Sequence, residues 1–376
     1  MYYYKAENIY KLRNWYERDR QPVILEEIRA SIQEEPQGNP DGMEEKAEFP
    51  YNIEIVAEEL FVPWALDITK DGRIFFTERS GNIRLIENGV LQTSPLFTFI
   101  PPFEAQGEGG LMGLVLDPDF EENGYFYVMY TYVEEGEFFN KVVRMHYERE
   151  NTMEDRVLLE RIPGDRVHNG GRLKIGPDGK LYATTGDAGQ GELSQDINSL
   201  AGKILRMELD GRVPSDNPFG DSYVYALGLR NPQGLDWNED GILYASEHGN
   251  VAHDKINLIV PGGNYGWPLS EGDFIIPVFD SGDDTYAPSG IAFVKEGPFN
   301  GKLFVAALKA QQLLLMTLND AGRQAVEVES YLKDEFGRLR ESYRDVDGSI
   351  YLTTSNLDGR GLPNEGDDKI IRLVPR

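Results

Sequence analysis

Residues 176–187 read GPDGKLYATTGD, the clearest copy of a unit that recurs along the chain. Pro177 presets φ at the second position of a tight turn, and Gly179 suits its last position. The residues that follow, Leu181 to Thr185, are β-formers without helical periodicity. The stretch therefore predicts a turn that leads directly into a β-strand.

The same pattern, Asp or Asn followed by Gly, one variable residue and an apolar run, occurs six times. Its copies are DGRIFF (71–76), NGYFYV (123–128), DGKLYA (178–183), DGILYA (240–245), NGKLFV (300–305) and DGSIYL (347–352). The glycines lie 47 to 62 residues apart, an interval that holds the four short strands of one propeller blade. One such hairpin signal is common, but six at near-even spacing are not expected by chance. The sequence predicts an all-β fold, a six-bladed β-propeller of four-stranded antiparallel blades with an N-terminal extension.

Residues 1–48 differ in character from the repeats. Apolar and aromatic side chains near the start follow helical spacing: Ile9, Leu12, Trp15 and Tyr16. Residues 34–50 are charged and rich in turn formers, which is typical of a linker. We expect residues 1–48 to form a helical or partly disordered extension and residues 49–376 to form the catalytic propeller.

The chain of 376 residues is strongly acidic, with a formal net charge of −27. Such a surface repels phosphate backbones and anionic lipid, which disfavours nucleic-acid and membrane-surface partners. The absence of cysteine excludes disulfides, thiolate nucleophiles and cysteine-bound metals. No run of about 18 apolar residues predicts a membrane span, and the first 21 residues lack the pattern of a signal peptide.

His168 is a candidate general base. It precedes two glycines, which permit a ligand to approach the backbone, and it stands immediately before the repeat at 178–183. Histidine titrates near neutral pH and is the commonest general base. Asp187 ends the same unit and could orient an imidazole or a cation. A turn histidine with satisfied hydrogen bonds explains the position equally well from sequence alone.

Cationic and amide side chains also stand beside the repeats. Arg230 supplies a planar fork of donors for carboxylates, and Asn231 adds a donor and an acceptor. Arg338 and Arg340 are two residues apart, so on a strand both lie on one face, where they would attract an anionic ligand. Pairing with a neighbouring blade and a solvated strand edge are the open alternatives.

Two other features could contribute to a site. Lys309 follows the repeat at 300–305, although a lone lysine is more often a surface residue. The stretches SEHGN (246–250) and GGNYGWP (262–268) carry backbone carbonyls that could hold a hard cation such as Ca²⁺, although structural turns are commoner.

Taken in order, these segments resemble the soluble aldose sugar dehydrogenases that depend on pyrroloquinoline quinone (PQQ), the soluble glucose dehydrogenase family. The resemblance covers about residues 52–376 and rests on VPWALDI, GEGGLMGLVLDPDF, HNGGRLKIGPDGKLYATTGD, LGLRNPQGL, SEHGN, INLIVPGGNYGWP, ALKAQ and GRLR. No single string is decisive, but the ordered set is specific. The family fold is a six-bladed propeller. The resemblance implies PQQ- and Ca²⁺-dependent oxidation of an aldose sugar at C1 to the lactone, with electrons passing to an external acceptor.

The resemblance also implies three catalytic residues. His168 matches the general base that removes the proton of the sugar C1 hydroxyl while hydride passes from C1 to PQQ, and we also expect it among the cofactor-binding residues. Asp187 matches the aspartate that supports this histidine. Arg230 and Asn231 match the pair that contacts the quinone, and Arg230 would stabilise the negative charge that develops there.

Cofactor and metal ligands follow from the same match. Lys309, Arg338 and Arg340 correspond to the basic residues that grip the carboxylates and quinone oxygens of PQQ. The carbonyls of Gly249 and Asn250 correspond to the pair that holds the catalytic Ca²⁺. PQQ is a flat tricarboxylate, so an acidic protein needs concentrated positive charge to bind it.

Two features depart from the family pattern. Where the family usually has a glutamine near the cofactor, this chain has Glu108, whose carboxylate costs affinity unless it is protonated, paired or bound to calcium. We keep Glu108 among the expected cofactor-binding residues. Family members are normally exported, so the resemblance implies an extracytoplasmic location, periplasmic or secreted, although no signal peptide is visible.

Two other functions stay open at this point. A Ca²⁺-dependent lactonase of propeller type would need carboxylate and asparagine ligands converging on one metal, and the sequence shows no such set. A non-catalytic propeller that binds a partner is favoured only by Glu108, and is disfavoured by His168, Asp187 and Arg230. The sequence carries no signal for a preferred sugar, a particular electron acceptor or an oligomeric state.

Overall fold

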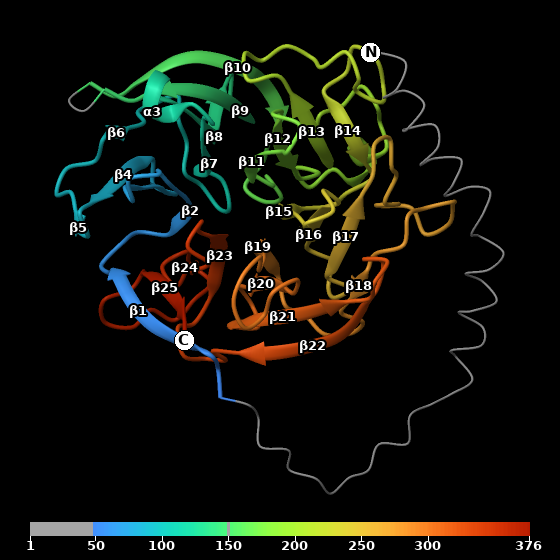
Figure 1. Ribbon diagram of the computed structural model, residues 1–376. Helices are drawn as coiled ribbons and strands as arrows, with labels where there is room; N and C mark the ends of the chain where they lie inside the picture. The colour runs from blue at the N-terminus through green and yellow to red at the C-terminus, as the bar shows by residue number, and fades with distance from the viewer. Residues whose placement is uncertain (1–47, 149–150) are drawn as a thin grey trace, which may run out of the picture. The chain divides into compact units, whose positions relative to one another are not determined.

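The computed structural model describes residues 48–148 and 151–376, and these form six antiparallel sheets arranged as blades in a ring (Figure 1). The predicted six-bladed propeller is therefore confirmed. The predicted extension at 1–48 lies outside the described residues, apart from Glu48. No helix in the described part of the chain is long and apolar enough to cross a membrane.

Blades 1 to 3 follow one another along the chain, and in each the strands pair in sequence order. Blade 1 contains β2 (Pro63–Ile68), β3 (Ile74–Glu78), β4 (Asn82–Glu87) and β5 (Val90–Leu91), with a short extra strand β6 (Phe97–Thr98) paired to β4. Blade 2 contains β7 (Leu111–Leu116), β8 (Tyr125–Glu134), β9 (Glu137–His146) and β10 (Met153–Pro163). Blade 3 contains β11 (Leu173–Ile175), β12 (Leu181–Thr185), β13 (Lys203–Met207) and β14 (Val224–Leu227). Two short helical turns lie in the connections: α3 (Phe120–Asn123) and a 3₁₀ turn (Gly191–Ser194).

Blades 4 to 6 complete the ring. Blade 4 contains β15 (Pro232–Trp237), β16 (Leu243–Glu247), β17 (Lys255–Ile259) and β18 (Phe279–Asp280). Blade 5 contains β19 (Pro288–Phe293), β20 (Leu303–Ala307), β21 (Gln312–Leu318) and β22 (Ala325–Tyr331). Blade 6 contains β23 (Leu339–Arg344), β24 (Ile350–Thr354), β25 (Ile370–Pro375) and β1 (Tyr51–Ala57).

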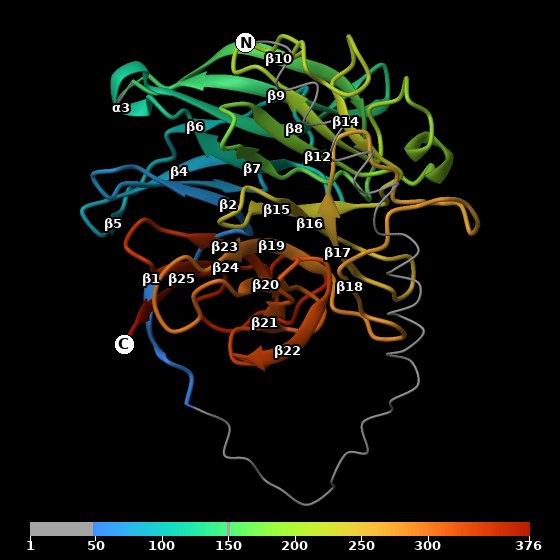
Figure 2. The ribbon, with the colours of Figure 1, turned by 45° about the vertical axis from the view of Figure 1, so that its right-hand side comes forward.

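The ring is closed by strands from its two ends. β1 pairs antiparallel with β25, with Tyr51 opposite Pro375 and Ile53 opposite Leu373. The two strands lie side by side in both views of the molecule (Figures 1 and 2). Because the first strand of the propeller completes the last blade, opening the ring requires the loss of this pairing.

The recurring Asp/Asn-Gly unit lies at the hairpin between the first and second strands of each blade. Its glycines all have positive φ, from 66° to 85°. A Cβ at Gly72, Gly179, Gly241 or Gly301 would meet no atom within 4 Å. The left-handed backbone conformation, rather than crowding, therefore explains the glycine at these turns.

Apolar side chains fill the space between blades. All six residues of β7 and all six of β19 are buried. In the cluster beside blades 1 and 2, the fully buried Phe75 ring packs edge-on against Phe120 and Tyr147, with both centroids at 5.1 Å. Burying an aromatic side chain of this size stabilises the fold by about 1.5–3 kcal/mol.

Candidate active site

Two adjacent cavities lie at one end of the ring, which we call the mouth. The smaller is lined by residues from all six blades: Trp64, Arg79, Gly107, Glu108, Asn169, Gly170, Gln233, His248, Leu308, Arg338, Arg340, Asp358 and Arg360. Each stands near the start of a first strand or just beyond the end of a second strand, and in antiparallel pairs these points share one end of the sheet. His248 also lines the larger cavity, so the two are neighbours.

The smaller cavity is cationic although the chain is acidic. Among the described residues that line it, four guanidinium groups face two carboxylates: Arg79, Arg338, Arg340 and Arg360 against Glu108 and Asp358. Burial lowers the pKa of His248 to about 4, so its imidazole is neutral at pH 7. The lining therefore carries a net charge of +2 in a chain whose net charge is −27.

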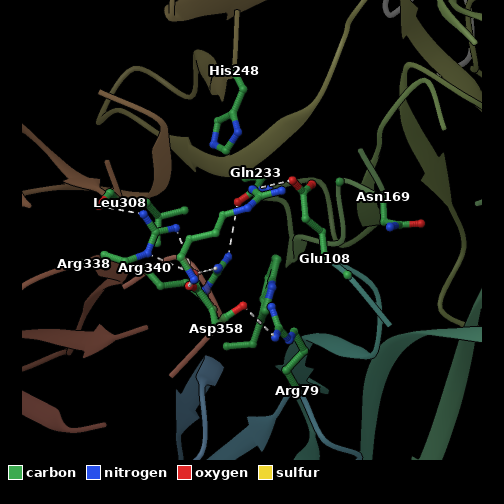
Figure 3. Close-up of a pocket in the computed structure, with 13 residues that line it drawn as sticks. Arg79, Glu108, Asn169, Gln233, His248, Leu308, Arg338, Arg340 and Asp358 are labelled. Carbon is green, nitrogen blue, oxygen red and sulfur yellow. Dashed lines mark hydrogen bonds and ion pairs between the residues drawn. The ribbon is translucent and has the colours of Figure 1, made fainter. Parts of the chain in front are cut away.

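Asp358 organises the arginines of this cavity (Figure 3). Its Oδ2 accepts hydrogen bonds from Nε and Nη2 of Arg338, at 3.0 and 2.8 Å, and lies 3.5 Å from Nη2 of Arg340. Burial alone would raise the pKa of Asp358, but the charges of Arg340 and Arg338 hold it below its usual value. Arg340 also donates to Oε1 of Gln233 at 3.3 Å. The structure thus brings the two predicted arginines together and fixes both on one carboxylate.

His168 is oriented by Asp187. Nδ1 of His168 lies 2.7 Å from Oδ1 of Asp187, which also accepts the N–H of Gly189 at 2.8 Å, while Oδ2 accepts from Nε1 of Trp267 at 2.7 Å. Burial would raise the pKa of Asp187, but these hydrogen bonds and the charge of His168 hold its pKa below the usual value. An ionised carboxylate only accepts hydrogen bonds, so Nδ1 of His168 carries the proton and Nε2 keeps its lone pair.

The backbone around His168 is held in an uncommon conformation. Its φ is 55°, a region that non-glycine residues seldom adopt. The His168 N–H donates to Oε2 of Glu108 at 2.9 Å. A Cβ at Gly186 would lie 1.9 Å from the His168 carbonyl oxygen, so glycine is required for this close approach. The surrounding contacts therefore impose the position of the histidine.

Arg230 and Asn231 lie close to this histidine. The guanidinium carbon of Arg230 is 5.4 Å from the ring centroid of Trp267, the residue that also donates to Asp187. Oδ1 of Asn231 accepts the N–H of Gly170 at 3.0 Å. Nδ2 of Asn231 is buried and has no hydrogen-bond partner among the described residues. A ligand oxygen is the natural partner for this amide group.

Gly249 and Asn250 line the larger cavity, whose volume is about 500 Å³. The Gly249 N–H donates to Oδ1 of Asp254 at 2.9 Å, and a Cβ there would lie 1.8 Å from the Ala252 carbonyl oxygen. In the described part of the chain, neither carbonyl accepts a hydrogen bond. No group of three or more acidic or histidine side chains there could hold a metal ion, so a cation at this site would depend on backbone oxygens.

Lys309 is placed differently from the other expected cofactor ligands. Like His168 and Asn231, whose neighbours Asn169, Gly170 and Arg230 do so, Lys309 lines neither cavity. Its side chain is also exposed, unlike those of the other expected cofactor ligands. Its neighbour Leu308 lines the smaller cavity instead, and the Leu308 carbonyl accepts from Nη1 of Arg338 at 3.3 Å. Lys309 can therefore reach a ligand only from the edge of the mouth.

Sequence reasoning missed several lining residues that lie shortly after the second strand of a blade. Arg79, His248 and Asp358 each follow the second strand of a blade, as Asp187 does in blade 3. Aligning the six copies on their glycines would have identified Arg79 and His248, which both lie seven residues after the glycine, but not Asp358, which lies ten residues after it. The His248 ring points into the smaller cavity in Figure 3, and its Nε2 has no hydrogen-bond partner among the described residues.

Fold and site together define a propeller enzyme whose mouth can bind a small polyanion beside an oriented histidine base. The sequence model of the glucose/sorbosone dehydrogenase family matches residues 60–364. An aldose sugar dehydrogenase of Escherichia coli (strain K12) is 31% identical over 344 residues, covering 83% of this chain and 92% of the relative. Quinoprotein glucose dehydrogenase B of Acinetobacter calcoaceticus is 33% identical over 324 residues, covering 72% and 66%.

A solved structure agrees with these relatives. The PQQ-bound form of an aldose sugar dehydrogenase from Streptomyces coelicolor matches with a TM-score of 0.78 and 36% identity, covering 86% of this chain and 98% of that one. The chain therefore belongs to the glucose/sorbosone dehydrogenase family and is an oxidoreductase. The resemblance to PQQ-dependent sugar dehydrogenases is confirmed.

Proposed function

We propose that this protein oxidises aldose sugars at C1 to the lactone with PQQ and Ca²⁺, and passes the electrons to an external acceptor. The observation that carries the proposal is the net charge of +2 on the lining of the smaller cavity, which suits the carboxylates of PQQ. Because the volume of this cavity is only about 30 Å³, the rest of the cofactor would lie in the adjoining cavity of about 500 Å³. The PQQ-bound relative supports the choice of anion. We also propose an extracytoplasmic site of action, as the resemblance implies.

The residues of the mouth fit PQQ in chemistry as well as charge. Arg338 and Arg340 would hold its carboxylates, with Arg79 close by: Nη2 of Arg79 donates to the Asp358 carbonyl at 3.3 Å. The buried Nδ2 of Asn231 and Nε2 of His248 have no partner among the described residues and would gain one from the quinone oxygens or ring nitrogen. A carboxylate-rich ligand would thus complete hydrogen bonds that the described side chains leave unmade.

Calcium would be held by the carbonyls of Gly249 and Asn250. Hard cations prefer oxygen ligands, and PQQ itself would supply further oxygens. The two carbonyls accept no hydrogen bond from the described residues, and Gly249 and Asn250 line the larger cavity together with His248. This arrangement supports the proposed calcium site, for which residues 48–148 and 151–376 provide no cluster of acidic or histidine side chains.

His168 would take the proton of the sugar C1 hydroxyl on Nε2. Asp187 fixes the tautomer that leaves this nitrogen free and stabilises the imidazolium that forms. Arg230, beside Trp267, would offset negative charge that develops near the base during the reaction. When bound, PQQ supplies the two-electron acceptor for the hydrogen on C1.

The proposal is tested with purified protein freed of metal and cofactor. PQQ and Ca²⁺ are added separately and together, and aldose-dependent reduction of a redox dye is followed. Activity that requires PQQ supports the proposal. Lactone hydrolysis without PQQ would instead indicate a propeller lactonase, and silence in both assays would indicate a non-catalytic binding protein.

A further inference from the structure

Glu108 and Arg360 join two distant segments across the mouth. Glu108 lies between β6 and β7, and Arg360 lies between β24 and β25. Nη1 of Arg360 donates to Oε1 of Glu108 at 2.7 Å. The other oxygen, Oε2, accepts the backbone N–H of His168 at 2.9 Å. One carboxylate therefore both holds the backbone of the candidate base and pairs with a guanidinium.

Glu108 is ionised in this position. Burial alone would raise its pKa, but the charge of Arg360 and the hydrogen bond from the His168 N–H hold the pKa below its usual value. The Glu108 side chain is 18% exposed and that of Arg360 is 56% exposed. The carboxylate is thus largely enclosed, while the guanidinium stands on the solvent side of the pair.

An enclosed carboxylate in the lining opposes the binding of an anion, because like charges repel strongly where water is excluded. The second carboxylate of the cavity, Asp358, is already shared by Arg338 and Arg340. In the described part of the chain, Arg360 is the cation in hydrogen-bond contact with Glu108. The pairing with Arg360 therefore offsets the repulsion between Glu108 and an anion in the cavity.

We propose that Arg360 is a positioning residue of the cofactor pocket, and that its charge cancels that of Glu108 so that PQQ can bind beside it. Glu108 is thereby free to anchor His168 without excluding the cofactor. This inference rests on the proposed function, since it takes PQQ as the anion.

The experiment compares PQQ binding by cofactor-free variants, followed by PQQ fluorescence without sugar. R360Q leaves an unpaired carboxylate in the cavity and should weaken PQQ affinity about 10- to 100-fold, the equivalent of one to two pKa units of unfavourable interaction. R360K keeps the charge and should stay within about threefold of the wild type. E108Q removes the carboxylate that repels the anion. In the double variant E108Q/R360Q neither position is charged, so it should bind PQQ at least tenfold more tightly than R360Q.

A matched control separates this effect from the general loss of an arginine. Arg212 pairs with Asp210 at 2.7 Å on the exposed surface and lines neither cavity, so R212Q should bind PQQ like the wild type. Thermal unfolding of each cofactor-free variant shows that it is folded. Wild-type affinity in R360Q, or no recovery in the double variant, overturns the inference alone. Failure of the wild type to bind PQQ overturns the proposed function and this inference with it.

Discussion

Arg172 and Glu341 form a buried ion pair between opposite blades: Nη1 of Arg172 donates to Oε2 of Glu341, and both side chains are 2% exposed. Arg172 directly precedes β11 in blade 3, and Glu341 lies in β23 of blade 6, three blades away in a ring of six. Nε of Arg172 donates to the Gln233 carbonyl at 2.9 Å, and its guanidinium carbon is 4.3 Å from the Trp64 ring centroid. Because Gln233 and Trp64 line the smaller cavity, the ion pair across the ring supports two residues of the candidate site.

Replacing Arg172 with methionine should destabilise the fold, because Glu341 would stay buried without its counter-charge. Burial already raises the pKa of Glu341, and removing one partner of a buried pair costs about 3–5 kcal/mol. We expect urea denaturation to show that R172M lowers the free energy of unfolding by this amount, and that R172M/E341M restores at least part of it. R212M, at an exposed pair, is the control and should leave stability unchanged. Wild-type stability of R172M would show that the pair is dispensable.

The blade count could be predicted because its signal is local. Each Asp/Asn-Gly turn needs a residue that tolerates positive φ, and this need is visible within six residues of sequence. The closing pair of β1 with β25 could not be predicted in the same way. Its partners, such as Tyr51 and Pro375, are distant in sequence and share no turn chemistry. The short strand β6 was likewise not predicted, because two residues carry no periodicity.

In the candidate site, too, contacts between residues close in sequence could be predicted, whereas contacts between distant segments could not. His168 and Asp187 flank one repeat, so their proximity could be inferred from the hairpin between them. The contact between Glu108 and Arg360 spans 252 residues, and only the closed ring brings the two together. Exposure of a single side chain, such as Lys309, depends on how its loop turns and is not visible in the sequence.

Replacing His168 with asparagine should remove the base while keeping the local backbone, because asparagine tolerates the φ of 55° found there. We expect kcat for aldose oxidation to fall by about 10²- to 10⁴-fold, the usual contribution of a positioned base. PQQ affinity should change by less than about threefold, since the arginines remain. H146A, at a half-buried histidine that ends β9 and lies beside Glu148, is the control. Normal turnover in the asparagine variant would mean that another group is the base.

Asp187 should make the folded protein less stable as the pH falls into the acidic range. Its pKa is lower in the folded protein than the value of about 3.9 in an unfolded chain, so its contribution is present above about pH 4 and is lost as the pH falls through the folded pKa. D187N loses an acceptor for buried donors and should cost about 1–3 kcal/mol at pH 6. The difference in free energy of unfolding between D187N and the wild type, measured by urea denaturation, should become smaller below pH 4. D273N, at an exposed position, serves as the control, and a pH-independent difference for D187N would refute this account.

Replacing His248 with leucine should separate folding from cofactor binding. Nε2 of His248 is buried without a hydrogen-bond partner among the described residues, so an apolar side chain of similar size should keep or raise the melting temperature of the cofactor-free protein. PQQ affinity should fall by about 3- to 10-fold, because one net hydrogen bond is worth about 0.5–1.5 kcal/mol. H248Q retains a polar tip and should bind PQQ more tightly than H248L. Because the same imidazole lines both cavities, unchanged PQQ affinity in H248L would show that the cofactor does not reach the junction between them.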